Sequence, residues 1–182
     1  MKPGIHNSGD VGVKRPTMAI IALGSNMGDS GKIVSEAMAR LQMYSDKPLL
    51  KSSLWQSSPV DCPPDSAQFV NAVVGLAVKE NETAETLLEK LKGLEREFGR
   101  TPKKILNEPR ALDLDLIAFG DEVRNTADLT LPHPRAHLRK FVLEPLNEIA
   151  PDTILAGQGK TVSQLLAGVS SNETVVKIEH RA

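Results

Sequence analysis

An alternation of leucine and aspartate constrains the fold of this chain more than any other feature. In the run Leu112–Leu116, three leucines alternate with Asp113 and Asp115. Successive side chains of a β-strand point to opposite faces, so the run predicts a strand with its leucines on one face and both carboxylates on the other. We expect the leucine face to be buried in the core beneath a sheet.

The two carboxylates admit two interpretations. Alternate side chains lie about 6.5–7 Å apart at the backbone, which lets both carboxylates reach shared cations such as Mg²⁺. A carboxylate beside a core is costly unless a positive group pairs with it, and strands disfavour aspartate, so a metal site is one interpretation. The other is a half-solvated antiparallel strand whose acidic face meets water. The run alone leaves both open.

Length and composition indicate the class of protein. The chain has 182 residues, of which 40% are hydrophobic and 25% charged, values typical of a soluble globular protein with one sizeable core. We expect residues 1–17 to form a flexible N-terminal extension and residues 18–182 to form a single domain.

Charge and cysteine content restrict the partners and the compartment. The formal net charge of −1 argues against a nucleic-acid partner, which would require a basic surface. No apolar run approaches the length needed to cross a membrane. The single cysteine, Cys62, excludes an internal disulfide and fits a reducing compartment. We therefore expect a cytoplasmic protein with no membrane partner.

The order of the predicted elements indicates a ferredoxin-like fold. Strands are predicted over 18–23, 49–56, 69–78 and 112–117, and helices over 30–41, capped by Ser30, and 83–98, capped by Thr83 or Asn81. This β-α-β-β-α-β order is that of a ferredoxin-like α+β sandwich. Extra C-terminal elements are expected over 141–149, 161–166 and 174–178.

Basic side chains flank the acidic run on both sides. Arg110 lies three residues before Asp113. The other basic residues form two clusters, which are Arg100, Lys103 and Lys104 upstream of the run and His133, Arg135, His137 and Arg139 downstream of it. Cations opposite metal-binding acids are what polyphosphate recognition needs. A solvated lysine pair and a structural histidine are the alternatives. Neither a Walker loop nor a dinucleotide fingerprint is present, so any nucleotide would be held by metal, arginine and lysine.

A second group of residues suits a planar ligand. Phe69 and Asn71 share one face of a predicted strand, so a ring and an amide could contact one flat heterocycle. The long loop over 57–68 precedes them, and long loops in compact domains are often functional. A phenylalanine packed under a helix, a locally satisfied asparagine and a plain surface loop are the alternatives.

Four fragments, in this order, resemble the 6-hydroxymethyl-7,8-dihydropterin pyrophosphokinase family. They are Ala22–Asn26, Phe69–Ala72, Pro109–Asp115, and Leu131–Arg135 with Arg139–Phe141. The resemblance extends from about Met18 into the C-terminal region. It implies a ferredoxin-like α+β fold and transfer of pyrophosphate from ATP to the pterin hydroxymethyl group, with release of AMP, in folate biosynthesis. No protein nucleophile is implied, since such transfer depends on positioning and charge neutralisation.

The resemblance also implies residue roles and partners. Asp113 and Asp115 would hold two Mg²⁺ ions, and Arg100 and Arg110 would act with them in catalysis. ATP would be bound by Lys103, Arg110, Thr130, His133 and Arg139. The pterin would be bound by Ser57, Val60, Phe69, Asn71 and Phe141. ATP and the pterin are the expected partners, and the protein is expected to be a monomer.

The sequence departs from the family pattern just before Pro109. Family members commonly have a basic residue, a tryptophan and a glycine where this chain has Leu106, Asn107 and Glu108, and Pro102 replaces a loop arginine. An alternative function is therefore a nucleotide- or pterin-binding homologue whose turnover is impaired by the altered loop. A third hypothesis, an RNA-binding ferredoxin-like domain, is disfavoured because the predicted strands lack the aromatic stacking set.

Overall fold

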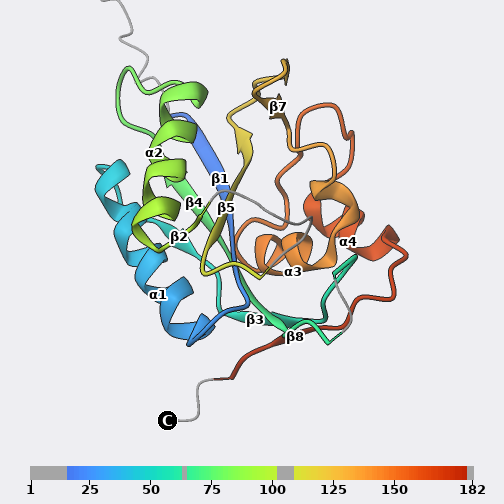
Figure 1. The fold of residues 1–182 in the computed structure, drawn as a ribbon. Coiled ribbons are helices and arrows are strands. Elements are labelled where there is room, and N and C mark those ends of the chain that lie inside the picture. Colours follow the sequence, from blue (N-terminus) through green and yellow to red (C-terminus); the bar gives the residue numbers. More distant parts are fainter. Residues whose placement is uncertain (1–15, 63–64, 102–108, 180–182) are drawn as a thin grey trace, which may run out of the picture.

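The computed structural model describes residues 16–62, 65–101 and 109–179, which form an antiparallel sheet between two layers of helices (Figure 1). The strands are β1 (Met18–Ser25), β2 (Leu50–Lys51), β3 (Trp55–Ser57), β4 (Phe69–Ala77), β5 (Asp113–Phe119), β6 (Arg124–Asn125), β7 (Thr130–Leu131) and β8 (Val175–Lys177). The α-helices are α1 (Ser30–Leu41), α2 (Ala84–Glu97), α3 (Lys140–Ile149) and α4 (Val162–Gly168). Short 3-10 turns cover Gln42–Tyr44 and Ala136–Leu138.

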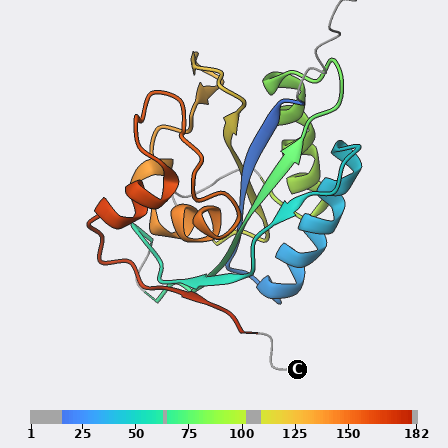
Figure 2. The same ribbon diagram turned by 180° about the vertical axis from the view of Figure 1, so that it is seen from behind.

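The strands of the main sheet run in the order β5-β1-β4-β3-β8, and β2 also pairs with β4. Every pairing is antiparallel. Helices α1 and α2 cover one face, and α3 and α4 lie on the other, as Figures 1 and 2 show from opposite sides. The predicted mixture of an antiparallel sheet with helices is confirmed. No helix in the described ranges is long and apolar enough to cross a membrane.

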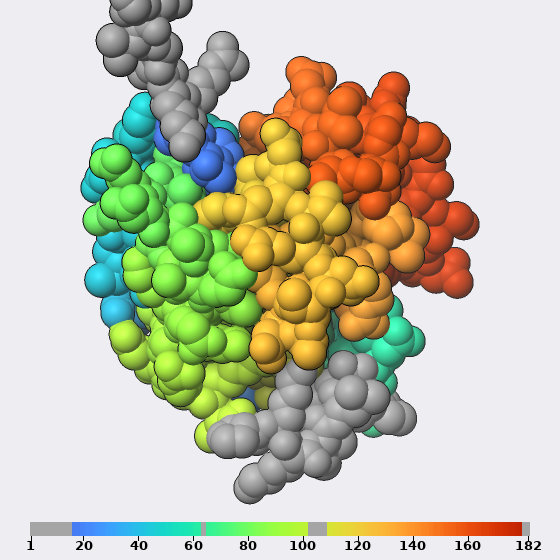
Figure 3. Space-filling model, turned by 90° about the horizontal axis from the view of Figure 1, so that it is seen from above, coloured from blue at the N-terminus to red at the C-terminus, as the bar shows by residue number. Residues whose placement is uncertain are grey.

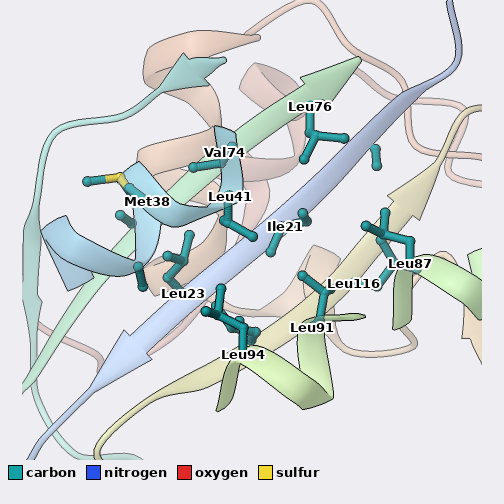
Figure 4. Close-up of a cluster of buried hydrophobic side chains, with 14 of the residues drawn as sticks. Ile21, Leu23, Met38, Leu41, Val74, Leu76, Leu87, Leu91, Leu94 and Leu116 are labelled. Carbon is teal, nitrogen blue, oxygen red and sulfur yellow. The ribbon is translucent and has the colours of Figure 1, made fainter. Parts of the chain in front are cut away.

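The larger core lies between the sheet and helices α1 and α2. Side chains from β1, β4, β5, α1 and α2 meet there, and Figure 4 labels Ile21, Leu76, Leu91, Leu94 and Leu116 among them. Full burial of one such side chain is worth about 1.5–3 kcal/mol. All three leucines of the run Leu112–Leu116 belong to this core, so the predicted leucine face is confirmed.

Helix α1 begins differently from the prediction. Its N-cap is Asp29, whose Oδ1 accepts a hydrogen bond of 3.1 Å from the backbone of Lys32, and Ser30 is already helical. Both residue types favour N-caps, so the sequence pattern did not separate them. The prediction that Ser30 caps the helix is wrong by one residue.

The strand predicted over 49–56 is two short strands. Lys51 lies opposite Val74, and Trp55 lies opposite Asn71. The chain therefore advances four residues from β2 to β3 while β4 advances three. This extra residue is the mark of a bulge. At the break, the Ser52 hydroxyl accepts a hydrogen bond of 2.9 Å from the backbone of Val73 and replaces part of the ladder.

The carboxylate of Glu148 connects α3 to the edge of the sheet. Its oxygens accept hydrogen bonds from the backbone and hydroxyl of Ser53 at 2.9 and 2.7 Å, from Trp55 Nε1 at 3.1 Å and from Lys177 Nζ at 2.8 Å. Burial acts to raise the pKa of Glu148, but the hydrogen bonds from Lys177, Ser53 and Trp55 outweigh it and lower the pKa to about 2. The ionised carboxylate therefore stabilises the fold.

We predict that Glu148→Gln lowers the free energy of unfolding by about 1–2 kcal/mol at pH 7. A pKa held below its unfolded value of 4.5 gives stability that is present above pH 4.5 and lost as the pH falls to about 2. The difference between the two proteins should therefore shrink across that window. Urea unfolding at several pH values measures it, with Glu144→Gln on the same helix as the control. A difference independent of pH would contradict the prediction.

Candidate active site

The register of the sheet places polar residues of β4 and β5 on either side of small residues of β1. Gly24 of β1 lies opposite Asn71 of β4 on one side and opposite Asp113 of β5 on the other. One step along, Ala22 lies between Val73 and Asp115. Alternation places these side chains on the face away from the leucine core. The predicted placement of both aspartates on one face is therefore confirmed.

One cavity at this end of the sheet, the ring-lined cavity, carries two phenylalanines. Its walls come from β1, β4, β5, the N-terminus of α3 and the loop after β3, and it includes every residue predicted for the pterin: Ser57, Val60, Phe69, Asn71 and Phe141. Ser58 and Cys62 complete the loop wall. The residues of the planar-ligand prediction thus lie together.

Gly24 leaves the space that this cavity needs. A Cβ atom at Gly24 would stand 3.4 Å from Asn71 Oδ1 and 4.0 Å from Phe69 Cδ1. Asn71 is buried, and its Nδ2 donates to Ser57 Oγ at 2.8 Å. That bond fixes the plane of the amide and ties β4 to the end of β3.

A second cavity, the cation-lined cavity, lies on the other side of the two aspartates. Its lining includes His133 and six cationic side chains: Lys92, Arg96, Arg100, Arg110, Arg135 and Arg139. Glu95, Asp113 and Asp115 also line it. Such an excess of cations suits a polyanion.

Four residues line both cavities, and they are Arg110, Asp113, Asp115 and Arg139. The two carboxylates therefore lie at the junction of a cavity with aromatic walls and a cavity with cationic walls. Figure 3, the view from above, shows the segment around residues 110–140 between the α2 side and the C-terminal region. A group transferred from one cavity to the other would pass these four side chains.

Two arginines neutralise Asp113. Arg100 Nη1 lies 2.7 Å from Asp113 Oδ1, and Arg110 Nη1 lies 2.6 Å from Asp113 Oδ2. The backbone of Arg110 is fixed in turn, because its N–H donates to Asn26 Oδ1 at 2.8 Å and its carbonyl accepts from Asn26 N at 3.2 Å. The segment before β5 is thus anchored to the segment after β1.

Glu95 supports this arrangement and was missed by the sequence analysis. It is 5% exposed, pairs with Arg100, and accepts a hydrogen bond of 2.7 Å from the backbone of Leu114. Burial raises the pKa of Glu95 to about 7. A glutamate inside the apolar stripe of α2, four residues after Leu91 and next to Leu94, was the available signal.

Asp115 has a different environment from Asp113. No ion pair reaches Asp115 from the described part of the chain, whereas Asp113 has two. Burial, followed by the charge of Asp113, raises the pKa of Asp115 to about 6, although Arg139, Arg110 and Arg100 act to lower it. Its ionised form is therefore short of positive charge.

The two carboxylates of Asp113 and Asp115 suit Mg²⁺, which needs few ligands from the protein, better than a metal whose ligands all come from the protein. Within the described ranges, no three His, Cys, Asp or Glu side chains are grouped to hold a metal. Mg²⁺ commonly uses one or two carboxylates and completes its shell with water and substrate phosphates. Asp113 and Asp115 supply those two carboxylates beside a cavity suited to phosphate.

His133 presents a neutral hydrogen-bond donor to the cation-lined cavity. Its backbone N–H donates to Ile117 at 2.8 Å, and its Nδ1 accepts from Arg135 N at 3.2 Å. Burial and the charges of Arg139 and Arg135 lower the pKa of His133. With Nδ1 occupied as an acceptor, the proton of the neutral ring lies on Nε2.

Arg139 connects the two cavities through Phe141. It is the N-cap residue of α3, and its guanidinium carbon lies 5.4 Å from the centre of the Phe141 ring. This is the range of a cation–π contact. One face of the Phe141 ring is therefore occupied by a cation.

One of the predicted ATP residues, Thr130, lies away from both cavities. Thr130 is in β7 and is not among the described residues that line either cavity. Another predicted ATP residue, Lys103, lies outside the described residues. The same is true of Pro102, of the altered positions Leu106, Asn107 and Glu108, and of most of the predicted extension over 1–17. Besides Glu95, two exposed residues of α2 that line the cation-lined cavity, Lys92 and Arg96, were not predicted from the sequence.

Comparison with known proteins identifies the family. The model of the 7,8-dihydro-6-hydroxymethylpterin-pyrophosphokinase family matches residues 20–151. The chain is 38% identical over 151 residues to the 2-amino-4-hydroxy-6-hydroxymethyldihydropteridine pyrophosphokinase of Synechocystis, covering 83% of this chain and 75% of that protein. It is 40% identical to the protein of the same name from Bacillus subtilis, covering 72% of this chain and 77% of that protein.

The chain belongs to this family. It is an ATP-dependent pyrophosphokinase of folate biosynthesis, and the alternative of a homologue with impaired turnover is not favoured. The fold of wild-type Plasmodium falciparum HPPK-DHPS with pteroate is also similar, with a TM-score of 0.62 and 12% identity. That match covers 84% of this chain, which spans only 44% of the length of that one.

We predict that Asp115→Asn increases the stability of the free protein at pH 8 by about 1–3 kcal/mol. Because the folded pKa is raised from 3.8 to about 6, the ionised group lowers stability progressively as the pH rises through that window. The asparagine variant should lose this dependence. Thermal unfolding at pH 4 and pH 8 without added metal measures it. Equal stability of variant and parent at pH 8 would contradict the prediction.

Proposed function

We propose that this pyrophosphokinase transfers the pyrophosphoryl group of ATP directly to the hydroxymethyl oxygen of 6-hydroxymethyl-7,8-dihydropterin and releases AMP. The observation that carries this proposal is the sharing of Arg110, Asp113, Asp115 and Arg139 by two chemically different cavities. The bond between the β-phosphorus and the oxygen that bridges it to the α-phosphorus breaks as the pterin oxygen bonds to the β-phosphorus. AMP leaves with the bridging oxygen, and the proton of the hydroxymethyl group is released to water.

The ring-lined cavity would hold the pterin. Phe69 and Phe141 supply rings for stacking on a flat heterocycle. Because Arg139 covers one face of Phe141, the pterin would use the other. The amide oxygen of Asn71 and the backbone from Ser57 to Val60 would hydrogen-bond to its polar edge.

The cation-lined cavity would hold the triphosphate of ATP. His133 would donate from Nε2 to a phosphate oxygen, and Arg139 would neutralise charge beside the pterin oxygen. Arg100 and Arg110, now paired with Asp113, would turn in part to the phosphates. The family resemblance also implies that Thr130 lies near the nucleoside and that Lys103 contacts the phosphates, and we propose both roles on that ground.

Asp113 and Asp115 would hold two Mg²⁺ ions. The raised pKa of Asp115 and its lack of an ion pair with any described residue support a role for it as a metal ligand. When bound, such ions neutralise phosphate charge and align the reacting oxygens. The chain itself supplies the two carboxylates and the arginines around them.

We also propose the finer features of the molecule. The order of β1, α1, β2 with β3, β4, α2 and β5, with β5-β1-β4-β3 as neighbours in the sheet, supports a ferredoxin-like arrangement with C-terminal additions. We propose that the chain acts as a single domain over residues 18–182, as a monomer, and in the cytoplasm.

We predict that the nucleotide product is AMP and that Asp115→Ala lowers its formation by about 10²-fold or more while the fold is retained. Asp128→Ala, at an exposed position, is the control. Chromatography of ATP, ADP and AMP with and without a chelator gives the measurement, and chelation should stop the reaction. ADP as the product would reject the proposed reaction, and full activity of Asp115→Ala would reject the metal assignment.

We predict that two variants each raise the KM for a different substrate. Phe69 lines only the ring-lined cavity and His133 only the cation-lined one. Phe69→Ala should raise the KM for the pterin about tenfold, the loss of a stacking contact worth roughly 1.4 kcal/mol. His133→Ala should raise the KM for ATP instead. Steady-state kinetics with each substrate varied measures both values, and each variant serves as the control for the other.

A further inference from the structure

Glu148 lies on the helix that begins at the active site. Arg139 caps α3, and Phe141 is in its first turn. Glu148 follows Phe141 by seven residues, which is two turns, so the two side chains leave the same side of the helix. Any shift of α3 that follows Glu148 would therefore move Phe141.

The partners of Glu148 lie in or next to β3 and β8, and β3 ends at Ser57 in the wall of the ring-lined cavity. Ser53 precedes β3, Trp55 begins it, and Lys177 ends β8. The side chain of Glu148 is 26% exposed, and its two oxygens accept all four hydrogen bonds. One carboxylate thus joins α3, β3 and β8.

Strand β8 continues this connection to the loop that lines the cavity. Val175 lies opposite Ser57, the last residue of β3. The next residue, Ser58, donates its backbone N–H to the carbonyl of Thr174 at 3.0 Å, and its Oγ accepts from Thr174 N at 3.1 Å. The C-terminal strand therefore holds the start of the loop wall in place.

The family description does not account for this strand. The match to the family model ends at residue 151, and β8 covers Val175–Lys177. None of the described residues of the cation-lined cavity comes from β3 or β8. On the side of the strands, the network around Glu148 therefore reaches only the ring-lined cavity, through Ser57 of β3.

We propose that Glu148, together with β8, is a positioning residue that sets the spacing between Phe141 and the loop wall at Ser57 and Ser58. The proposal rests on the assignment of the pterin to the ring-lined cavity. A flat ligand stacked on Phe141 depends on that spacing, because displacements of about 1 Å in a positioned contact are costly. The triphosphate would be held by side chains from several elements, and only one of them, Arg139, lies on α3. It is therefore expected to depend on that spacing far less.

The test compares Glu148→Gln with Lys177→Met and with the control Glu144→Gln on the same helix. We expect Glu148→Gln to raise the Kd for 6-hydroxymethylpterin about tenfold, measured by calorimetry with a non-hydrolysable ATP analogue present. Lys177→Met should raise it less, and Glu144→Gln should leave it unchanged. The Kd for the analogue alone should change less than about twofold in all three.

Trp55 gives a second readout, since it is the only tryptophan of the chain and donates directly to Glu148. Its emission should change in Glu148→Gln and not in Glu144→Gln. If Glu148→Gln fails to fold, Thr174→Pro decides instead, with Thr174→Ala as its control. The proline removes the hydrogen bond that the backbone N–H of Thr174 donates to Ser58 Oγ.

Equal losses of affinity for the pterin and for the analogue, or an unchanged pterin Kd in a folded variant, would overturn the proposal. The proposed function fails in a different way. A parent protein that binds both ligands but forms no AMP would reject the reaction, while the binding comparison would still test the role of Glu148.

Discussion

The site depends on the charge balance around two carboxylates placed two residues apart on one strand. Asp113 is neutralised by Arg100 and Arg110, whereas Asp115 has no ion pair in the described part of the chain and its pKa is raised to about 6. Of the two aspartates, Asp115 thus carries the unfavourable charge. Protonation, or a ligand that brings positive charge to Asp115, relieves this penalty. The ionised carboxylate therefore lowers the stability of the free protein at the position that is expected to bind metal.

The arginines that balance this charge come from positions that the fold must bring together. Arg100 follows α2 and is held by the buried Glu95, which also fixes the backbone of Leu114 in β5. Arg110 is held through the backbone by Asn26, at the end of β1. The position of the guanidinium groups is therefore set by the packing of α2 and β1 against β5 and does not depend on one loop.

Local patterns in the sequence predicted those features of the fold that depend on neighbouring residues in the chain. The leucine alternation fixed the two faces of β5, and the apolar stripe with Thr83 fixed α2. What depends on distant partners escaped prediction. The break between β2 and β3 follows from pairing with β4, and the roles of Glu95 and Glu148 follow from partners up to 95 residues away. A glutamate on a helix carries no mark of such partners.

The two cavities differ in how firmly their walls are held. The ring-lined cavity has walls from the sheet and from α3, and its polar groups are already fixed, as in the hydrogen bond between Asn71 and Ser57. The cation-lined cavity is lined partly by long exposed side chains of α2, Lys92 and Arg96. A fixed wall distinguishes one flat heterocycle from another, because a misfit leaves buried polar groups unpaired. Long cations follow a flexible polyanion and neutralise it in more than one conformation. Substrate selectivity is therefore expected to come from the ring-lined side and charge neutralisation from the other, with the two carboxylates fixed between them.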